Sequence, residues 1–86
     1  MDKKLNTIRE AITNDLEKLS IIVDEITYEK CGKYYFLRIV LDKVNGIDLD
    51  TIVEATHIIN PIVDELDLIK DSYILDVISK EKGSVE

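Results

Sequence analysis

The stretch Lys33–Leu49, KYYFLRIVLDKVNGIDL, predicts a strand, a tight turn and the start of a helix. Residues Tyr34–Leu41 are rich in aromatic and β-branched side chains and contain a single charge, Arg38, which is typical of a mostly covered strand. Asn45-Gly46 then indicates a turn, because both residue types tolerate a positive φ. Asp48 follows as a candidate N-cap for a helix that begins immediately after it.

The flanking segments extend this pattern in both directions. Apolar residues at three- and four-residue steps predict helices over residues 4–19 and 49–66, and further strands are predicted over residues 22–30 and 73–78. Cys31-Gly32 marks a hairpin turn between the first two strands. In the second helix Pro61 predicts a kink or a break near Asn60. The stripe that this helix should bury is Leu49, Ile52, Val53, Thr56, Ile59, Val63 and Leu66.

The predicted order α-β-β-α-β indicates a two-layer α/β sandwich of the α+β class, with two helices on one face of a three-stranded mixed sheet. The second strand, second helix and third strand form a crossover that should be right-handed. We therefore expect the third strand to lie parallel to the second, in the strand order 1-2-3. Pairing of the third strand with the first, in the order 2-1-3, is the alternative.

Alternation of side chains assigns one face of the sheet to the core. In the central strand the core-facing set is Tyr35, Leu37, Ile39 and Leu41. In the first strand, Ile26 and Tyr28 share that face. Asp24 falls in the same register, where an apolar residue is expected, so either the strand begins after it or a bulge lies there.

The opposite face of the sheet is left open, because both helices are expected on one side. Arg38 should pair there with Glu25 or Asp76. Contiguous exposed apolar patches on small domains tend to mark partner surfaces, whereas scattered apolar residues or a register error of one residue need no partner. The expected occupants of this face are Val23, Glu25, Thr27, Glu29, Tyr34, Phe36, Arg38, Val40, Ile74, Asp76 and Ile78. The predicted partner-binding or self-association surface is Phe36, Arg38, Val40, Ile74, Asp76 and Ile78.

Composition narrows the classes of function. The 86 residues suffice for one domain, and 18 acidic against 11 basic residues give a net charge of −7. That charge opposes binding to nucleic acid and favours basic partners. Apolar runs are too short for a membrane span and the N-terminus lacks the features of a signal peptide, so we expect a cytoplasmic protein.

Motifs for catalysis and for metal or cofactor binding are missing from the sequence. There is no Gly-rich phosphate loop, no nucleophile elbow and no metal-spaced set of His and Cys. His57, the single histidine, is predicted to be structural, so we expect no enzyme, metal or cofactor. Cys31, the single cysteine, excludes an internal disulfide; a redox or dimer-forming role is the alternative to an incidental thiol.

Four segments, in their order and spacing, resemble one known family over residues 5–79. At the centre, Leu37–Lys43, Gly46-Ile47 and Leu49-Asp50 resemble the segment LR(V/I)xIDxxxGIxLDD of the N-terminal domain of RimP, the bacterial ribosome maturation factor. Upstream, Val23-Asp24-Glu25-Ile26-Thr27-Tyr28 is similar to the family's LVDVEY strand. Downstream, Asn60-Pro61-Ile62 lies where the family's helix has Ser-Pro-Leu, and Tyr73-Ile74-Leu75-Asp76-Val77 is similar to the family's Y-x-L-E-V strand.

The resemblance implies a RimP N-terminal-like domain over residues 1–79, followed by a polar, disordered tail at 80–86. The family's second domain, a β-barrel reached through an SSPGxDRPL junction, has no counterpart here, so we expect a stand-alone relative or a truncated product. By resemblance the function is non-enzymatic assembly of the small (30S) ribosomal subunit through contacts with a basic ribosomal protein. A stand-alone interaction or homodimerisation module is the alternative.

Direct sequence-specific RNA binding is disfavoured, although the element order is akin to one form of the KH domain. A KH domain clamps RNA with a GXXG loop, and no GXXG occurs in this sequence. Tyr34-Tyr35 could stack bases, but alternation sends the two rings to opposite faces.

Overall fold

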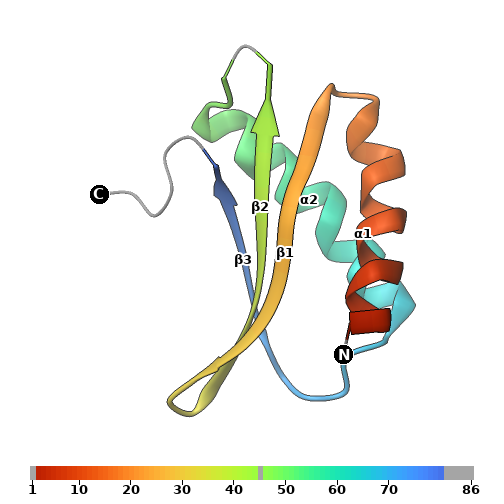
Figure 1. Cartoon of the computed structure of the whole chain (residues 1–86), viewed down its shortest axis with the longest axis vertical. Helices are drawn as coiled ribbons and strands as arrows, with labels where there is room; N and C mark the ends of the chain where they lie inside the picture. Colours follow the sequence, from red (N-terminus) through yellow and green to blue (C-terminus); the bar gives the residue numbers. More distant parts are fainter. Residues whose placement is uncertain (1, 45, 81–86) are drawn as a thin grey trace.

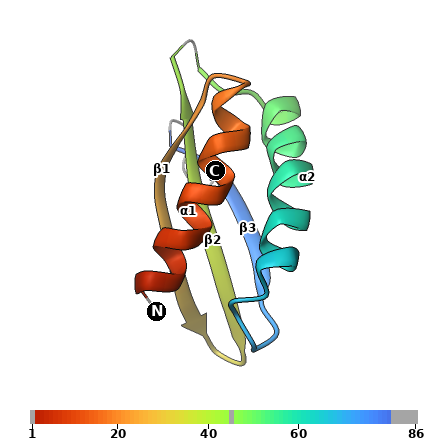
Figure 2. The ribbon, with the colours of Figure 1, turned by 90° about the vertical axis from the view of Figure 1, so that its right-hand side faces the viewer.

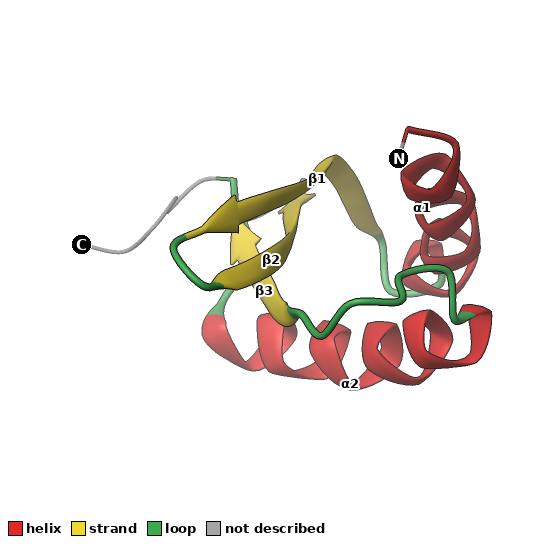
Figure 3. Cartoon of the chain, turned by 90° about the horizontal axis from the view of Figure 1, so that it is seen from below, coloured by secondary structure: helices red, strands yellow, loops and turns green. Residues whose placement is uncertain are grey.

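Five elements follow one another in the predicted order in the computed structural model, which describes residues 2–44 and 46–80 (Figure 1). They are α1 (Asp2–Glu17), β1 (Ile21–Cys31), β2 (Tyr34–Lys43), α2 (Leu49–Leu66) and β3 (Ile74–Ser79). Helix α1 packs against β1, α2 lies beside β3, and the two helices contact each other on one side of the sheet (Figures 2 and 3). The predicted α+β class is therefore confirmed. Of the predicted tail, residues 81–86 lie outside the described residues.

The sheet has the strand order β1-β2-β3, with β1 antiparallel and β3 parallel to β2. This confirms the predicted order and excludes the alternative in which β3 pairs with β1. The hairpin turn between β1 and β2 passes through Gly32, whose φ is 63°, a conformation that glycine adopts without steric cost. The parallel pairing of β3 requires a long crossover, which α2 supplies.

The core lies between the helices and the inner face of β2. As predicted, Leu37, Ile39 and Leu41 are completely buried, and Tyr35 at the end of the same face is partly buried. Residues at three- and four-residue steps on α1 and α2 meet them. The largest fully buried side chains are Ile8, Ile12, Leu16, Leu37, Ile39, Leu41 and Ile59.

Both ends of α2 are defined by aspartates, and its bounds match the prediction. Asp48 is the N-cap, since its Oδ1 accepts a hydrogen bond of 2.8 Å from the backbone N–H of Thr51, and this contact lowers the pKa of Asp48. Asp67 ends the helix in a left-handed conformation, and its N–H donates to the Val63 carbonyl. The helix runs without interruption through Pro61, so the break predicted near Asn60 does not occur. Ile59 before the proline and Val63 after it are both buried in the core, and this packing holds the helical turns on either side of Pro61 in line.

The buried stripe of α2 differs from the predicted one. Ala55, Ile59 and Val63 are buried, whereas Leu49 and Val53 are 75% and 47% exposed. The i, i+4 line through Ala55 faces the sheet and α1, and each step of one residue turns the helix by about 100° away from that line. Helix α1 also begins and ends two residues earlier than predicted, and Ser20 follows it with a φ of 62°.

The corrected stripe predicts unequal effects of two truncations on the same helix. Ile59→Ala should lower the free energy of unfolding by about 2–5 kcal/mol, because it leaves a cavity in the core. Val53→Ala should change it by less than about 0.5 kcal/mol, because the side chain is largely solvated. Urea denaturation followed by circular dichroism measures both. Equal losses would place Val53 in the core after all.

Candidate functional site

The face of the sheet opposite the helices is the candidate site, and we call it the open face. All six residues predicted to bind a partner lie on it, as three directly paired couples across β2 and β3: Phe36 with Ile74, Arg38 with Asp76, and Val40 with Ile78. By strand register its occupants are Ile22, Glu25, Thr27, Glu29, Cys31, Tyr34, Phe36, Arg38, Val40, Asp42, Ile74, Asp76 and Ile78.

Arg38 lies at the centre of the open face and is held by two carboxylates. Its Nε donates to Oδ2 of Asp76 over 3.0 Å, and its Nη1 lies 3.7 Å from Oε1 of Glu29. The predicted pairing of Arg38 with Asp76 is confirmed. Glu25 is not the second partner, because the Arg38 side chain extends toward Glu29 at the hairpin end of β1. Partly exposed pairs of this kind contribute only about 0.2–1 kcal/mol, so their main effect is to fix the position of the charge.

Apolar side chains flank this ion pair on both sides. Phe36 and Ile74 lie toward the hairpin, and Val40 and Ile78 lie toward the opposite end of the sheet. Ile74 is 45% exposed, while the other three are partly buried by their neighbours. An apolar surface on either side of a fixed charge provides both area to bury and a means of orienting a partner.

A β-bulge in β1 corrects one predicted member of the open face. The register with β2 shifts between Val23 and Glu25, so Asp24 is the extra residue and Val23 pairs with Leu41. Val23 is therefore a core residue, 7% exposed, and Ile22, 50% exposed, takes its place on the open face. The bulge was one of the two explanations predicted for Asp24, and it removes the carboxylate from the core register.

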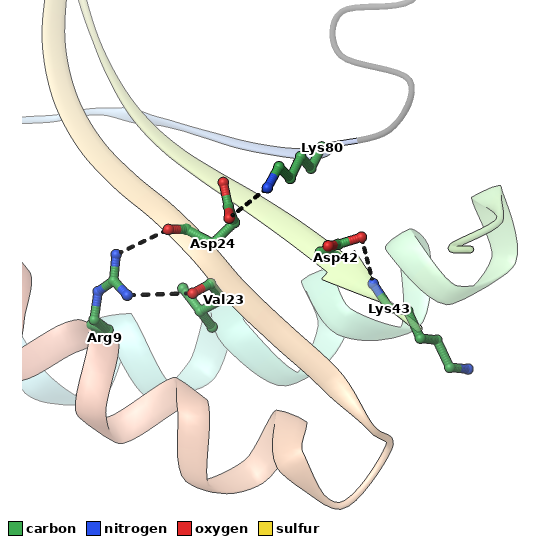
Figure 4. Close-up of polar contacts among 6 residues, drawn as sticks. All are labelled: Arg9, Val23, Asp24, Asp42, Lys43 and Lys80. Atoms are coloured by element: carbon green, nitrogen blue, oxygen red, sulfur yellow. Dashed lines mark hydrogen bonds and ion pairs between the residues drawn. The ribbon is translucent and has the colours of Figure 1, made fainter. Parts of the chain in front are cut away.

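The bulge is held from both faces of the sheet (Figure 4). From α1, Arg9 donates through Nη1 to the Val23 carbonyl over 3.3 Å and through Nη2 to the Asp24 carbonyl over 3.4 Å. On the open face, Lys80 Nζ lies 3.3 Å from Oδ1 of Asp24, and the backbone N–H of Lys80 donates to the Leu41 carbonyl. Residues from α1, β1 and the end of β3 thereby fix one corner of the open face.

The open face is acidic overall. Its carboxylates outnumber its cations, and both Arg38 and Lys80 are paired with carboxylates of the same face. Such a surface repels phosphate and attracts a basic protein. The acidic side chains on or beside the open face are Asp24, Glu25, Glu29, Asp42 and Asp76.

Groups of side chains that could hold a metal ion are not found in the part of the chain that the structure describes. Within residues 2–44 and 46–80, no three His, Cys, Asp or Glu side chains are placed to hold a metal ion. His57 is exposed on α2 and Cys31 is exposed at the hairpin. No described helix has the length and hydropathy needed to span a membrane.

Sequence reasoning missed a cluster of tyrosines at the hairpin end of the sheet. Tyr28 and Tyr35 stack with ring centroids 5.3 Å apart, and Tyr34, Tyr35 and Tyr73 line one depression beside them. As predicted, register sends Tyr34 to the open face and Tyr35 to the helix side. Burial, with Asp71 as the next cause, raises the pKa of Tyr28, whose buried hydroxyl has no hydrogen-bond partner among the described residues. The hairpin register was the available signal, since it brings Tyr28 and Tyr35 onto neighbouring positions.

Comparison with known protein families identifies the domain. Residues 10–80 match the family model described as the RimP N-terminal domain. The matched range begins within α1 and ends one residue beyond β3, so it contains the whole open face and the tyrosine cluster. The resemblance inferred from the sequence is therefore confirmed.

The two hydrogen bonds from Arg9 predict that this residue stabilises the bulge. Arg9→Met should lower the free energy of unfolding by about 1 kcal/mol, because the variant keeps the apolar stem and removes both donors. It should also speed hydrogen exchange of the backbone amides near the bulge. Lys4→Met is the control, since it removes the same charge from an exposed position on the same helix. Equal effects of the two variants would show that helix charge, not the bulge contact, is responsible.

Proposed function

Because this chain belongs to the family of RimP N-terminal domains, we propose that it acts in maturation of the small (30S) ribosomal subunit. Membership indicates a role like that of a ribosome maturation factor. In the proposal the domain is a cytoplasmic, non-enzymatic binding module that needs no cofactor. It docks through its open face onto a basic ribosomal protein of the assembling particle.

The observation that supports this proposal most strongly is the composition of the open face. The apolar couples Phe36–Ile74 and Val40–Ile78 offer area for burial, and the acidic side chains around them favour a basic partner. A net charge of −7 accelerates encounter with a positively charged protein. The same charges act against recognition of bare RNA, so the proposed contact is between proteins.

Self-association is the second candidate, and the exposure of Ile74, Tyr34 and Ile22 favours it. A two-fold dimer formed through the open face would bring the acidic side chains of one copy against those of the other. Like charges that face each other across an interface are unfavourable, especially when they lose water. The charge of the face therefore favours a basic partner over a second copy.

The proposal predicts salt-sensitive binding to the small subunit. The 86-residue chain should co-sediment with immature small subunits at low salt, more strongly than with mature ones, and binding should fall as salt rises. Binding to both particles alike would contradict a role in maturation. Failure of the folded chain to bind either particle at low salt would overturn the ribosomal role and direct attention to the dimer.

The role of the open face is tested by a matched pair of charge insertions. Ile74→Glu should weaken binding roughly tenfold or more, because it places a charge within the apolar part of the surface. Val53→Glu is the control, since Val53 is 47% exposed against 45% for Ile74 but lies on α2. Thermal unfolding shows whether both variants remain folded. Equal binding by the two would exclude the open face as the docking surface, and loss of a dimer in Ile74→Glu alone, seen by sedimentation velocity, would support self-association.

A further inference from the structure

A second surface feature lies next to the open face, where α2 and the segment before β3 meet. It is a shallow depression of about 500 Å³, large enough for one amino-acid side chain. Helix α2 contributes Asn60 and Asp64, and the following segment contributes Lys70, Asp71, Ser72 and Tyr73. We call it the Tyr73 depression.

Two carboxylates in the Tyr73 depression are available to a ligand. Asp64 and Asp71 are exposed, and neither forms an ion pair with another residue in the described part of the chain. This differs from Asp24 and Asp76 near the open face, each of which is paired with a cation. With Lys70 as the single cation of the lining, the depression has an excess of negative charge.

The negative charge acts directly on the tyrosine. Burial raises the pKa of Tyr73, and the nearby carboxylate of Asp64 raises it further. An aromatic face beside carboxylates attracts organic cations. The planar guanidinium of arginine suits such a site better than the ammonium of lysine, because it stacks on a ring while its N–H groups bind carboxylates.

We propose that the Tyr73 depression binds an arginine side chain of a basic partner protein, with the guanidinium against the Tyr73 ring and its N–H groups directed at Asp64 and Asp71. A metal ion is a poorer occupant, because the described residues provide no group of three ligands. That the arginine belongs to a ribosomal protein rests on the proposed function; the preference for a guanidinium does not.

The Tyr73 depression is continuous with the open face. Tyr73 also lines the neighbouring depression, whose other members include Tyr34 and Ile74 of the open face. A partner segment that covers Ile74 therefore also lies beside Tyr73, and one of its side chains can reach the Tyr73 ring. The depression extends the docking surface around the edge of the sheet at the start of β3.

The test uses N-acetyl-L-arginine amide as the probe and its lysine counterpart for comparison, both titrated into the ¹⁵N-labelled chain and followed by NMR. Chemical-shift changes should concentrate at residues 60, 64 and 70–73, and arginine should bind roughly threefold or more tightly than lysine. Equal affinity for the two probes, or shifts spread evenly over all acidic surfaces, would overturn the proposal. Because the probe is a small molecule, this result does not depend on whether the chain binds ribosomal particles.

Variants assign the contacts within the depression. Asp64→Asn with Asp71→Asn should weaken arginine binding roughly tenfold. Glu65→Gln is the charge control, since Glu65 is exposed beside Asp64 on α2 and does not line the depression. Tyr73→Phe should retain binding, and Tyr73→Leu should lose it while the chain remains folded. Similar losses from Glu65→Gln and from Asp64→Asn alone would show nonspecific attraction by charge.

Discussion

The pairing of β2 with strands on both of its sides is the constraint on which the rest of this structure depends. One face of β2 supplies Leu37, Ile39 and Leu41, all completely buried, and the other supplies Phe36, Arg38 and Val40. Because side chains alternate, a slip of one residue would exchange the two sets and place Arg38 in the core. The cost of burying that charge fixes the register of β2, and the same register defines the open face.

The bulge at Asp24 resolves a conflict between the two ends of β1. Val23 and Ile26 both belong in the core, yet strict alternation would send them to opposite faces. The extra residue Asp24 between them places both side chains on the core face. It also keeps the Asp24 carboxylate out of the core, where burial would cost several kcal/mol. Arg9 binds the carbonyl groups of Val23 and Asp24 at the bulge, and Lys80 binds the Asp24 carboxylate. The same three contacts connect α1 and the end of β3 to one corner of the open face.

Local sequence patterns predicted the helices and strands of this fold well. They failed for residues whose burial depends on contacts with segments distant in the sequence. The alternation of β2 and the Asp48 cap depend on near neighbours, and both were predicted from the sequence. The place of Val23 depends on whether β1 continues through a bulge at Asp24 or begins after it, and the sequence left these two alternatives open. The exposure of Val53 depends on the direction from which the sheet and α1 approach α2. The tyrosine cluster combines positions of β1, β2 and the residue just before β3, so it emerges only once the registers are known.

The two parts of the proposed docking surface should contribute differently to binding. On the open face the cations Arg38 and Lys80 already neutralise part of the acidic charge, so affinity there depends mainly on apolar area. In the Tyr73 depression the carboxylates of Asp64 and Asp71 have no such partner among the residues the structure describes, so a cation of the partner gains their full attraction. Exposed charge pairs are screened over about 8–10 Å at physiological salt, whereas apolar contacts are not. The salt dependence of binding should therefore arise mainly at the Tyr73 depression, and the binding that persists at high salt should arise on the open face.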